Sequence, residues 1–169
     1  MREFSRRSGI LFLLLLSACH TVPVFAPRES LVGKLLWKTP SRSLVFDAVI
    51  QYGTRNSVRI ILSKETSSPV LIVTRNASVL DVQDRFQGRH WRGSADHPPA
   101  VLSGWAVLAE TLLQASGTAN GTREIQPAAG WSATCRIQNG NPRELNLASK
   151  TESYRLVLQA ASFSPTSGR

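Results

Sequence analysis

Short segments in which apolar and polar residues alternate make up most of this chain. In residues 43–52, for example, Leu44, Phe46 and Ile50 share one face of an alternating pattern whose other face includes Asp47. A period of two places such residues on one side of a β-strand. Turn residues separate similar segments along the chain. The pattern predicts strands over residues 31–37, 43–52, 57–62, 70–74, 79–82, 86–92, 123–126, 131–137, 143–148 and 153–163.

One segment near the middle of the chain has helical periodicity. Residues 98–115 begin with two prolines, which suit a first helical turn, and Asp96 is expected to cap that turn. Ser116 and Gly117 follow as a stop signal. The apolar positions recur at mostly three- and four-residue intervals, which is typical of an amphipathic helix. These positions are Val101, Leu102, Trp105, Leu108, Ala109 and Leu112.

Consecutive strands joined by short turns, with one helix among them, predict a mainly β (α+β) fold. We expect a curved antiparallel sheet wrapped around one central helix. A single helix covers only part of a concave sheet, so an apolar cavity should remain. For each residue that could line this cavity, the alternative is that it simply packs in the hydrophobic core. The candidates are Trp37, Phe46, Ile50, Leu62, Leu71, Val73, Trp105, Leu108, Leu112 and Leu156.

The N-terminus has the pattern of a secretory signal. Arginines precede an apolar run over residues 10–16, which is too short to span a bilayer stably, and Leu16-Ser17-Ala18-Cys19 follows. This ending resembles the bacterial lipobox, which implies cleavage before Cys19 and covalent diacylglycerol and N-acyl (palmitate) lipid on that cysteine. An ordinary signal peptide that ends near a cysteine is the alternative. No other cofactor is expected.

The chain therefore divides into four parts. We expect a signal peptide over 1–18, lipidated Cys19 with a flexible tether over 19–30, one folded domain over 31–163, and a loose tail over 164–169. Several acyl chains would hold the protein at the membrane. His20, in place of the aspartate that retains enterobacterial lipoproteins at the inner membrane, favours the outer membrane, with a monomeric body facing the periplasm.

Charge and cysteine content narrow the possible partners. The net charge is +9, but the basic residues are scattered, and a secreted protein is not expected to meet nucleic acid. Attraction to anionic lipid headgroups is one interpretation, and plain solubility is the other. Once Cys19 is acylated, Cys135 has no partner for an intramolecular disulfide, so it is expected to be a small core residue.

Residues suited to catalysis are sparse. His90, Asp96 and His97 could approach one another, but their spacing matches no recurrent zinc-site pattern. The chain has no Gly-x-Ser-x-Gly elbow, phosphate loop or dinucleotide fingerprint. We therefore expect no enzymatic activity and no metal.

Three stretches resemble the LolA/LolB superfamily of lipoprotein carriers and outer-membrane receptors. Residues 33–37 (GKLLW) resemble its opening strand, residues 98–108 resemble the LolB helix with its Leu-x-x-Trp pattern, and residues 141–158 resemble its terminal hairpin. The loop over 63–69 is polar, whereas the LolB branch carries an apolar loop tip. The resemblance implies a half-open barrel lidded by helices and a cavity for acyl chains.

Two functions follow from these patterns. The first is a lipid-anchored outer-membrane lipoprotein that binds acyl chains or lipoproteins, for lipoprotein localisation or lipid handling, with a periplasmic carrier as a possible partner. The alternative is a non-enzymatic structural or assembly lipoprotein that holds a protein partner in the cell envelope.

Overall fold

A computed structural model describes residues 25–54, 56–65 and 68–160. The predicted signal peptide, Cys19, and the tail over 164–169 lie outside these residues. The strands are β1 (Pro27–Thr39), β2 (Arg42–Gly53), β3 (Ser57–Ser63), β4 (Pro69–Asn76), β5 (Val79–Asp84), β6 (Arg89–Ser94), β7 (Gly121–Ile125), β8 (Ser132–Gln138), β9 (Asn141–Ala148) and β10 (Ser153–Ala160). A 3-10 turn, η1 (Ala100–Leu102), runs directly into helix α2 (Ser103–Ala115) between β6 and β7.

All the strands belong to one 10-stranded antiparallel sheet, in the order β6-β5-β4-β3-β2-β1-β10-β9-β8-β7. Strands β6 and β7 stand at opposite ends of this order, so the sheet is not closed. Strand β1 joins the two halves, because Leu35 pairs with Phe46 of β2 on one side and with Leu156 of β10 on the other. Gly33 lets β1 lie close to β10, since a Cβ there would collide with the Val157 carbonyl.

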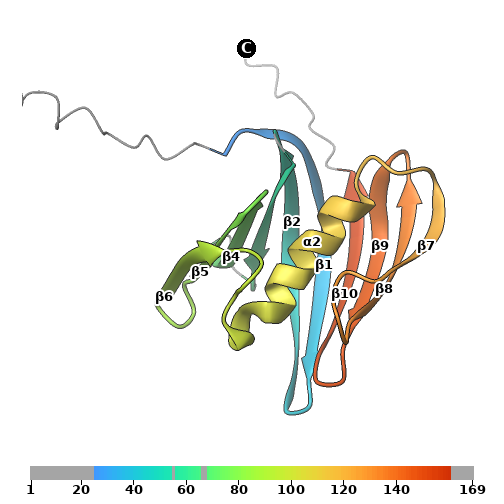
Figure 1. The fold of residues 1–169 in the computed structure, drawn as a ribbon. Helices are drawn as coiled ribbons and strands as arrows, with labels where there is room; N and C mark the ends of the chain where they lie inside the picture. The colour runs from blue at the N-terminus through green and yellow to red at the C-terminus, as the bar shows by residue number, and fades with distance from the viewer. Residues whose placement is uncertain (1–24, 55, 66–67, 161–169) are drawn as a thin grey trace, which may run out of the picture.

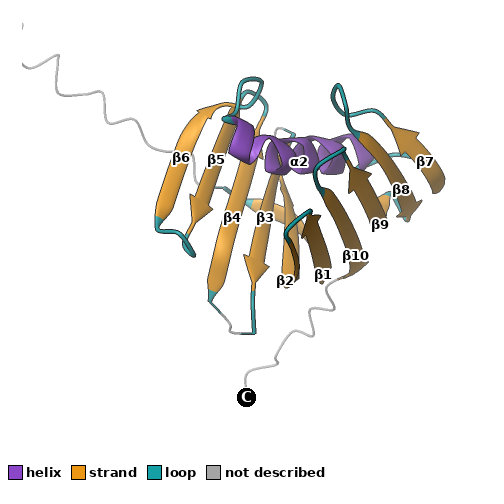
Figure 2. Cartoon of the chain, turned by 90° about the horizontal axis from the view of Figure 1, so that it is seen from below, coloured by secondary structure: helices purple, strands orange, loops and turns teal. Residues whose placement is uncertain are grey.

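Helix α2 lies on the concave face of the curved sheet (Figures 1 and 2). It packs on β3 and β4 in one half and on β8 and β9 in the other. Nine of its 13 residues are buried, far more than one narrow stripe would give. The helix therefore forms the centre of the core, and inward residues of both half-sheets pack around it.

The prediction of a mainly β fold with one antiparallel sheet and one helix is confirmed. The inner faces of the strands also alternate as expected. Strand β8, for example, is exposed and buried at strictly alternate positions, with Ala133, Cys135 and Ile137 inside.

Three local expectations were wrong. The first strand begins at Pro27, inside the predicted tether, because its first residues pair with the end of β2. Phe86 is not in a strand: Arg85 and Phe86 donate backbone hydrogen bonds to Val70, and residues 85–88 form a turn. Asp96 caps no helix, because Pro99 is extended and the helical turn begins only at Ala100.

Candidate functional site

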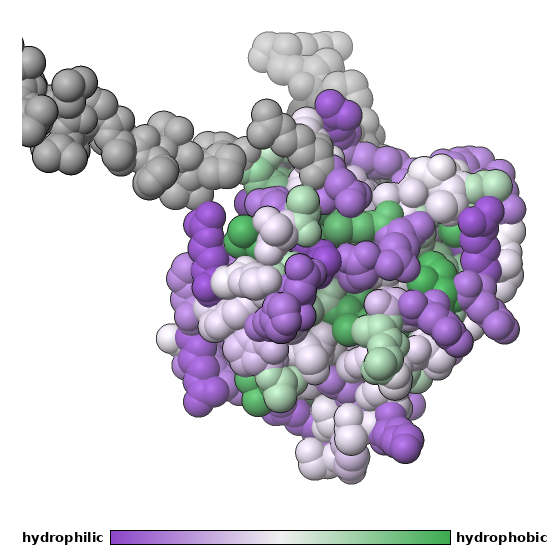
Figure 3. All heavy atoms as spheres, in the orientation of Figure 1, coloured by the Kyte–Doolittle hydropathy of each residue, from purple (hydrophilic) through white to green (hydrophobic). Residues whose placement is uncertain are grey.

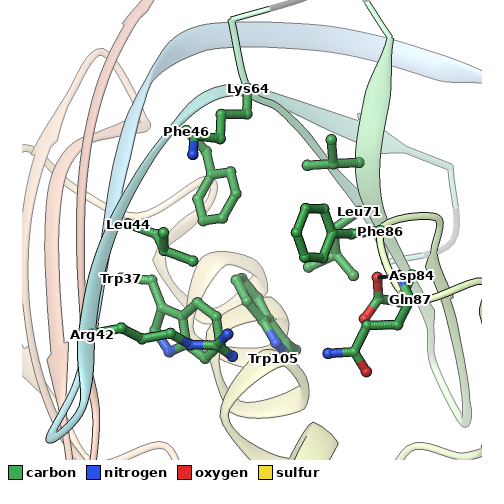
Figure 4. A pocket seen from close by; sticks show the side chains of 11 residues that line it. Trp37, Arg42, Leu44, Phe46, Lys64, Leu71, Asp84, Phe86, Gln87 and Trp105 are labelled. Atoms are coloured by element: carbon green, nitrogen blue, oxygen red, sulfur yellow. Dashed lines mark hydrogen bonds between the residues drawn. The ribbon is translucent and has the colours of Figure 1, made fainter.

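An apolar pocket opens at one end of the sheet, where the β1–β2, β3–β4 and β5–β6 turns meet the N-terminal end of α2 (Figure 4). Its cavity volume is about 250 Å³. In the space-filling view of Figure 3, apolar residues reach the surface in patches between polar ones. The lining consists of Trp37, Arg42, Leu44, Phe46, Lys64, Val70, Leu71, Asp84, Phe86, Gln87 and Trp105.

Antiparallel pairing explains why these residues meet. Trp37 stands near the end of β1, Leu44 opens β2 opposite it, and Leu71 stands near the start of β4. Strands that run in opposite directions bring such ends to one edge of the sheet. Trp105, in the first turn of α2, reaches this end, whereas the buried Leu108 and Leu112 lie further along the helix. The strand ends therefore keep part of their inner face uncovered.

Aromatic rings form the wall between the pocket and the C-terminal half-sheet. The ring centroids of Trp37 and Trp105 are 5.4 Å apart, and those of Trp105 and Tyr154 are 5.0 Å apart in an edge-on arrangement. Tyr154 is almost fully buried behind the two tryptophans. Edge-on and tilted pairs at such spacing stabilise one another beyond simple burial. The three rings therefore form one closely packed wall.

Glu152 fixes this wall through hydrogen bonds. Trp37 Nε1 donates to Glu152 Oε2 at 3.1 Å, and the Tyr154 hydroxyl donates to the same oxygen at 2.8 Å. Burial and the neighbouring carboxylate raise the pKa of Tyr154, so its hydroxyl remains a donor. Gly104 completes the contact, because a Cβ there would collide with the Tyr154 hydroxyl and the Glu152 carboxylate. The first turn of α2 is thus held against the β9–β10 turn.

The rim of the pocket is more polar than its floor. Arg42 and Lys64 are exposed cations on the rim, and Asp84 accepts a hydrogen bond from the backbone N–H of Gln87 at 2.9 Å. Phe86 belongs to the lining yet is 79% exposed. An exposed aromatic ring beside an apolar hollow can cover a bound ligand.

The structure brings only part of the predicted lining to this pocket. Four candidates line it: Trp37, Phe46, Leu71 and Trp105. The other six do not, and each is at most 1% exposed in the closed core: Ile50, Leu62, Val73, Leu108, Leu112 and Leu156. They pack where α2 covers the sheet, and they are not part of the lining of this pocket. Cys19, the predicted lipidation site, lies outside the described residues.

Sequence reasoning missed several lining residues. Leu44 shares the inward face with Phe46, so strand alternation alone could have found it. Phe86, Arg42 and Lys64 stand in or beside turns, and no periodic signal marks such positions. Only the three-dimensional arrangement of the turns shows that they surround the pocket.

Groups suited to covalent or metal chemistry are not gathered among the described residues. No cluster of three or more His, Cys, Asp and Glu side chains occurs in them. His90 Nε2 lies 3.3 Å from the Asp81 carboxylate on the neighbouring strand, away from the pocket lining. Burial raises the pKa of the Cys135 thiol to about 11, which keeps it protonated and unreactive near neutral pH.

Comparison with known proteins adds no family assignment. No protein-family model matches the chain, and no curated protein matches it either. Within the described ranges, no helix combines the length and the apolar character needed to cross a bilayer. The function must therefore be inferred from the pocket itself.

Proposed function

We propose that this chain is a lipid-anchored outer-membrane lipoprotein of LolA/LolB type that binds an acyl chain, free or carried by a lipoprotein, on its periplasmic side. The observation that carries the proposal is the apolar pocket beneath the first turn of α2, with Trp37, Phe46, Leu71 and Trp105 in its lining. Concave pockets lined by aromatic and aliphatic groups, with few polar groups, are the usual sites for apolar ligands.

The arrangement of sheet and helix supports the family proposal. An open, curved antiparallel sheet with a helix on its concave face is what a half-open barrel of this family would require. The three stretches that carry the resemblance correspond to β1, the η1–α2 segment and the β9–β10 hairpin. All three contribute to the pocket or to the aromatic wall behind it, through Trp37, Trp105 and Tyr154.

Burial of the bound acyl chain in the pocket would supply the binding free energy. Each methylene removed from water contributes about 0.8 kcal/mol. The wall that Glu152 holds in place keeps the site preformed, which lowers the ordering cost of binding. No covalent step is required.

Native mass spectrometry of the intact chain tests the proposal, and adjacent residues supply a matched pair of variants. Leu44 lines the pocket, whereas Val45 is 56% exposed on the opposite face of the same strand. The wild-type chain and Val45→Trp should retain an acyl-chain adduct, and Leu44→Trp, which fills the pocket, should lose it. Equal adducts on all three proteins, or none on any, would contradict the proposal.

Lipidation at Cys19 is tested separately. Wild-type chain should carry diacylglycerol and N-acyl mass on Cys19 and partition with outer membranes, and Cys19→Ser should do neither. Release of the wild-type chain into the soluble fraction would overturn the anchor without bearing on the pocket.

A different observation supports the second candidate, an assembly lipoprotein that binds a protein. Val32, Val45 and Val157 are between 39% and 56% exposed on the outward faces of the neighbouring strands β1, β2 and β10. Exposed apolar groups on one face of a sheet can form an interaction surface. A stoichiometric partner lost in Val45→Glu but retained in Leu44→Trp would favour this function.

A further inference from the structure

Strand β6 is an open edge of the sheet. It pairs with β5 over its whole length, from Arg89 to Ser94, and it is the last strand on that side (Figure 2). All of its residues are at least partly exposed. An edge strand presents backbone N–H and C=O groups that no neighbouring strand satisfies. The edge is therefore accessible to a further strand.

A hydrogen bond just beyond β6 shows which of its backbone groups face outward. Ala95 donates its backbone N–H to the Ser78 carbonyl at 2.9 Å, in continuation of the β5–β6 register. Hydrogen-bonded pairs recur at every second residue of an antiparallel ladder. The backbone groups of Trp91 therefore face β5, whereas those of His90 and Arg92 face away from the sheet. Among the described residues, no turn or loop bonds to the backbone of His90 or Arg92.

This open edge begins beside the pocket. Asp84, which ends β5, lines the pocket together with Phe86 and Gln87 of the following turn. In Figure 4 these three residues lie together on one side of the cavity. Strand β6 starts two residues after Gln87, at Arg89, which pairs with Asp84. A ligand segment that leaves the pocket past this turn would meet the start of β6.

The side chains of β6 favour a strand of particular composition. On the inner face, the Trp91 ring lies along the strand over Gly93, where a Cβ would collide with it. The ring is partly exposed and offers an apolar contact to an added strand. Arg89, His90 and Arg92 are exposed, and β6 carries no acidic residue. Since opposite charges across a strand pair attract, an added strand should combine apolar and acidic side chains.

A second copy of this chain fits the edge poorly. In the two longest antiparallel registers that use the outward backbone groups, Arg92 of one copy would stand opposite His90 or Arg92 of the other. Basic side chains directly opposite one another destabilise a strand pair. The edge therefore disfavours self-pairing and favours a strand of different charge.

Building on the proposed function, we infer that β6 binds an extended peptide attached to the acyl chain in the pocket, so that the peptide adds to the sheet as a further strand. Main-chain hydrogen bonds supply the affinity, and the Trp91 and Arg92 side chains select an apolar and an acidic residue. A peptide acylated at its N-terminus would run parallel to β6, because both start at the pocket. The preferred ligand is then an acylated polypeptide rather than a free fatty acid.

The test compares ligands that share an acyl group. The full chain with Cys19→Ser, which cannot be acylated there, is titrated with decanoyl amide, with an N-decanoyl peptide of alternating valine and glutamate, and with the same peptide N-acetylated. The decanoyl peptide should bind at least about tenfold more tightly than decanoyl amide, since net backbone hydrogen bonds contribute about fivefold each. The acetylated peptide should bind more weakly than the decanoyl peptide.

Each contrary outcome has a distinct meaning. Equal binding of decanoyl peptide and decanoyl amide would overturn this inference and leave the proposed function standing. Binding of neither would overturn both. An acetylated peptide that binds as tightly as the decanoyl peptide would overturn the link between edge and pocket.

Backbone methylation of the peptide tests strand addition itself. Alternate N–H groups of an added strand face β6, and the others face solvent. N-methylation of one alternate set should therefore abolish the gain over decanoyl amide, whereas methylation of the other set should retain it. Equal effects of the two sets would show that the peptide does not bind as a strand.

Arg92→Pro and Arg92→Gln form a matched pair of variants. Proline at an outward-facing edge position removes one donor and leaves the β5–β6 ladder intact, whereas glutamine removes only the charge. With an N-decanoyl peptide of alternating valine and glutamine, Arg92→Pro should lose affinity several-fold and Arg92→Gln should match the wild type. Neither variant should change the affinity for decanoyl amide. Equal peptide affinities of wild type and Arg92→Pro would contradict the inference, as would a wild-type dimer that Arg92→Pro abolishes.

Discussion

The two halves of the concave face are filled to different degrees. Beneath the C-terminal half, eight inward side chains of β8, β9 and β10 are at most 4% exposed, among them Cys135, Leu145 and Leu156. In the N-terminal half, the strand ends near the turns leave Leu44 and Val70 partly exposed beside the pocket. One helix serves both halves. The hollow therefore arises where the sheet extends beyond the helix, not from a shortage of apolar residues.

The contacts that hold α2 also differ between the halves. On the N-terminal side, Arg75 of β4 pairs with Glu110 at 2.6 Å, near the middle of the helix. On the C-terminal side, Glu152 and Tyr154 lie against Gly104 in the first turn. These two attachments fix the helix across the sheet. It cannot shift to close the pocket without breaking one of them.

Truncating a buried leucine should reveal the largest difference in stability between the two halves. Leu145→Ala removes a side chain that is 1% exposed and should lower the free energy of unfolding by about 2–5 kcal/mol. Leu44→Ala, at the pocket, should cost less than about 1 kcal/mol because its site is already partly open. Urea unfolding measures both. Equal losses would mean that the pocket end is packed as tightly as the rest.

Adding volume should also cost more stability in the C-terminal half than at the pocket. Cys135→Leu overfills a site that is 0% exposed and should cost about 1–3 kcal/mol. Leu44→Phe should leave stability within about 0.5 kcal/mol and reduce uptake of a hydrophobic probe. A stabilised Cys135→Leu variant would show that the C-terminal half also contains space.

A methyl group at the helix start should loosen the attachment to the C-terminal half. Gly104→Ala places a Cβ against the Tyr154 hydroxyl and Glu152, and should cost about 1–3 kcal/mol despite the better helix propensity of alanine. Thermal unfolding gives the shift, and tryptophan fluorescence should change because Trp37 and Trp105 lie beside the displaced groups. Ser103→Ala, one residue earlier, is the control and should change stability by less than about 0.5 kcal/mol.

The smallest effect on stability is expected at the rim. Phe86→Ala removes a ring that is 79% exposed, so stability should change by less than about 0.5 kcal/mol. Affinity for a hydrophobic probe should nevertheless fall several-fold, because the ring covers part of the pocket. Val101→Ala, at a residue 83% exposed and absent from the pocket lining, should leave affinity unchanged. Equal probe affinities of the two variants would show that Phe86 does not contribute to binding.

Periodicity predicted the strands and the helix because side-chain alternation is local and burial enforces it. It failed where backbone pairing decides the outcome, as at Pro27, which pairs with Gly53, and at Phe86, whose turn bonds to Val70. Periodicity identified the residues that point inward. It could not distinguish Ile50, which packs in the closed core, from Phe46, which lines the pocket. Whether an inward side chain meets the helix or open space depends on where α2 crosses the sheet, and no local pattern encodes that position.

A crystal soaked in 8-bromooctanoate would test the central claim most directly, because bromine gives an anomalous signal at the end of the chain. The account predicts one strong peak inside the pocket, between Phe46, Leu71 and Trp105. A peak only on the outward valines of β1, β2 and β10, or no peak at all, would contradict it.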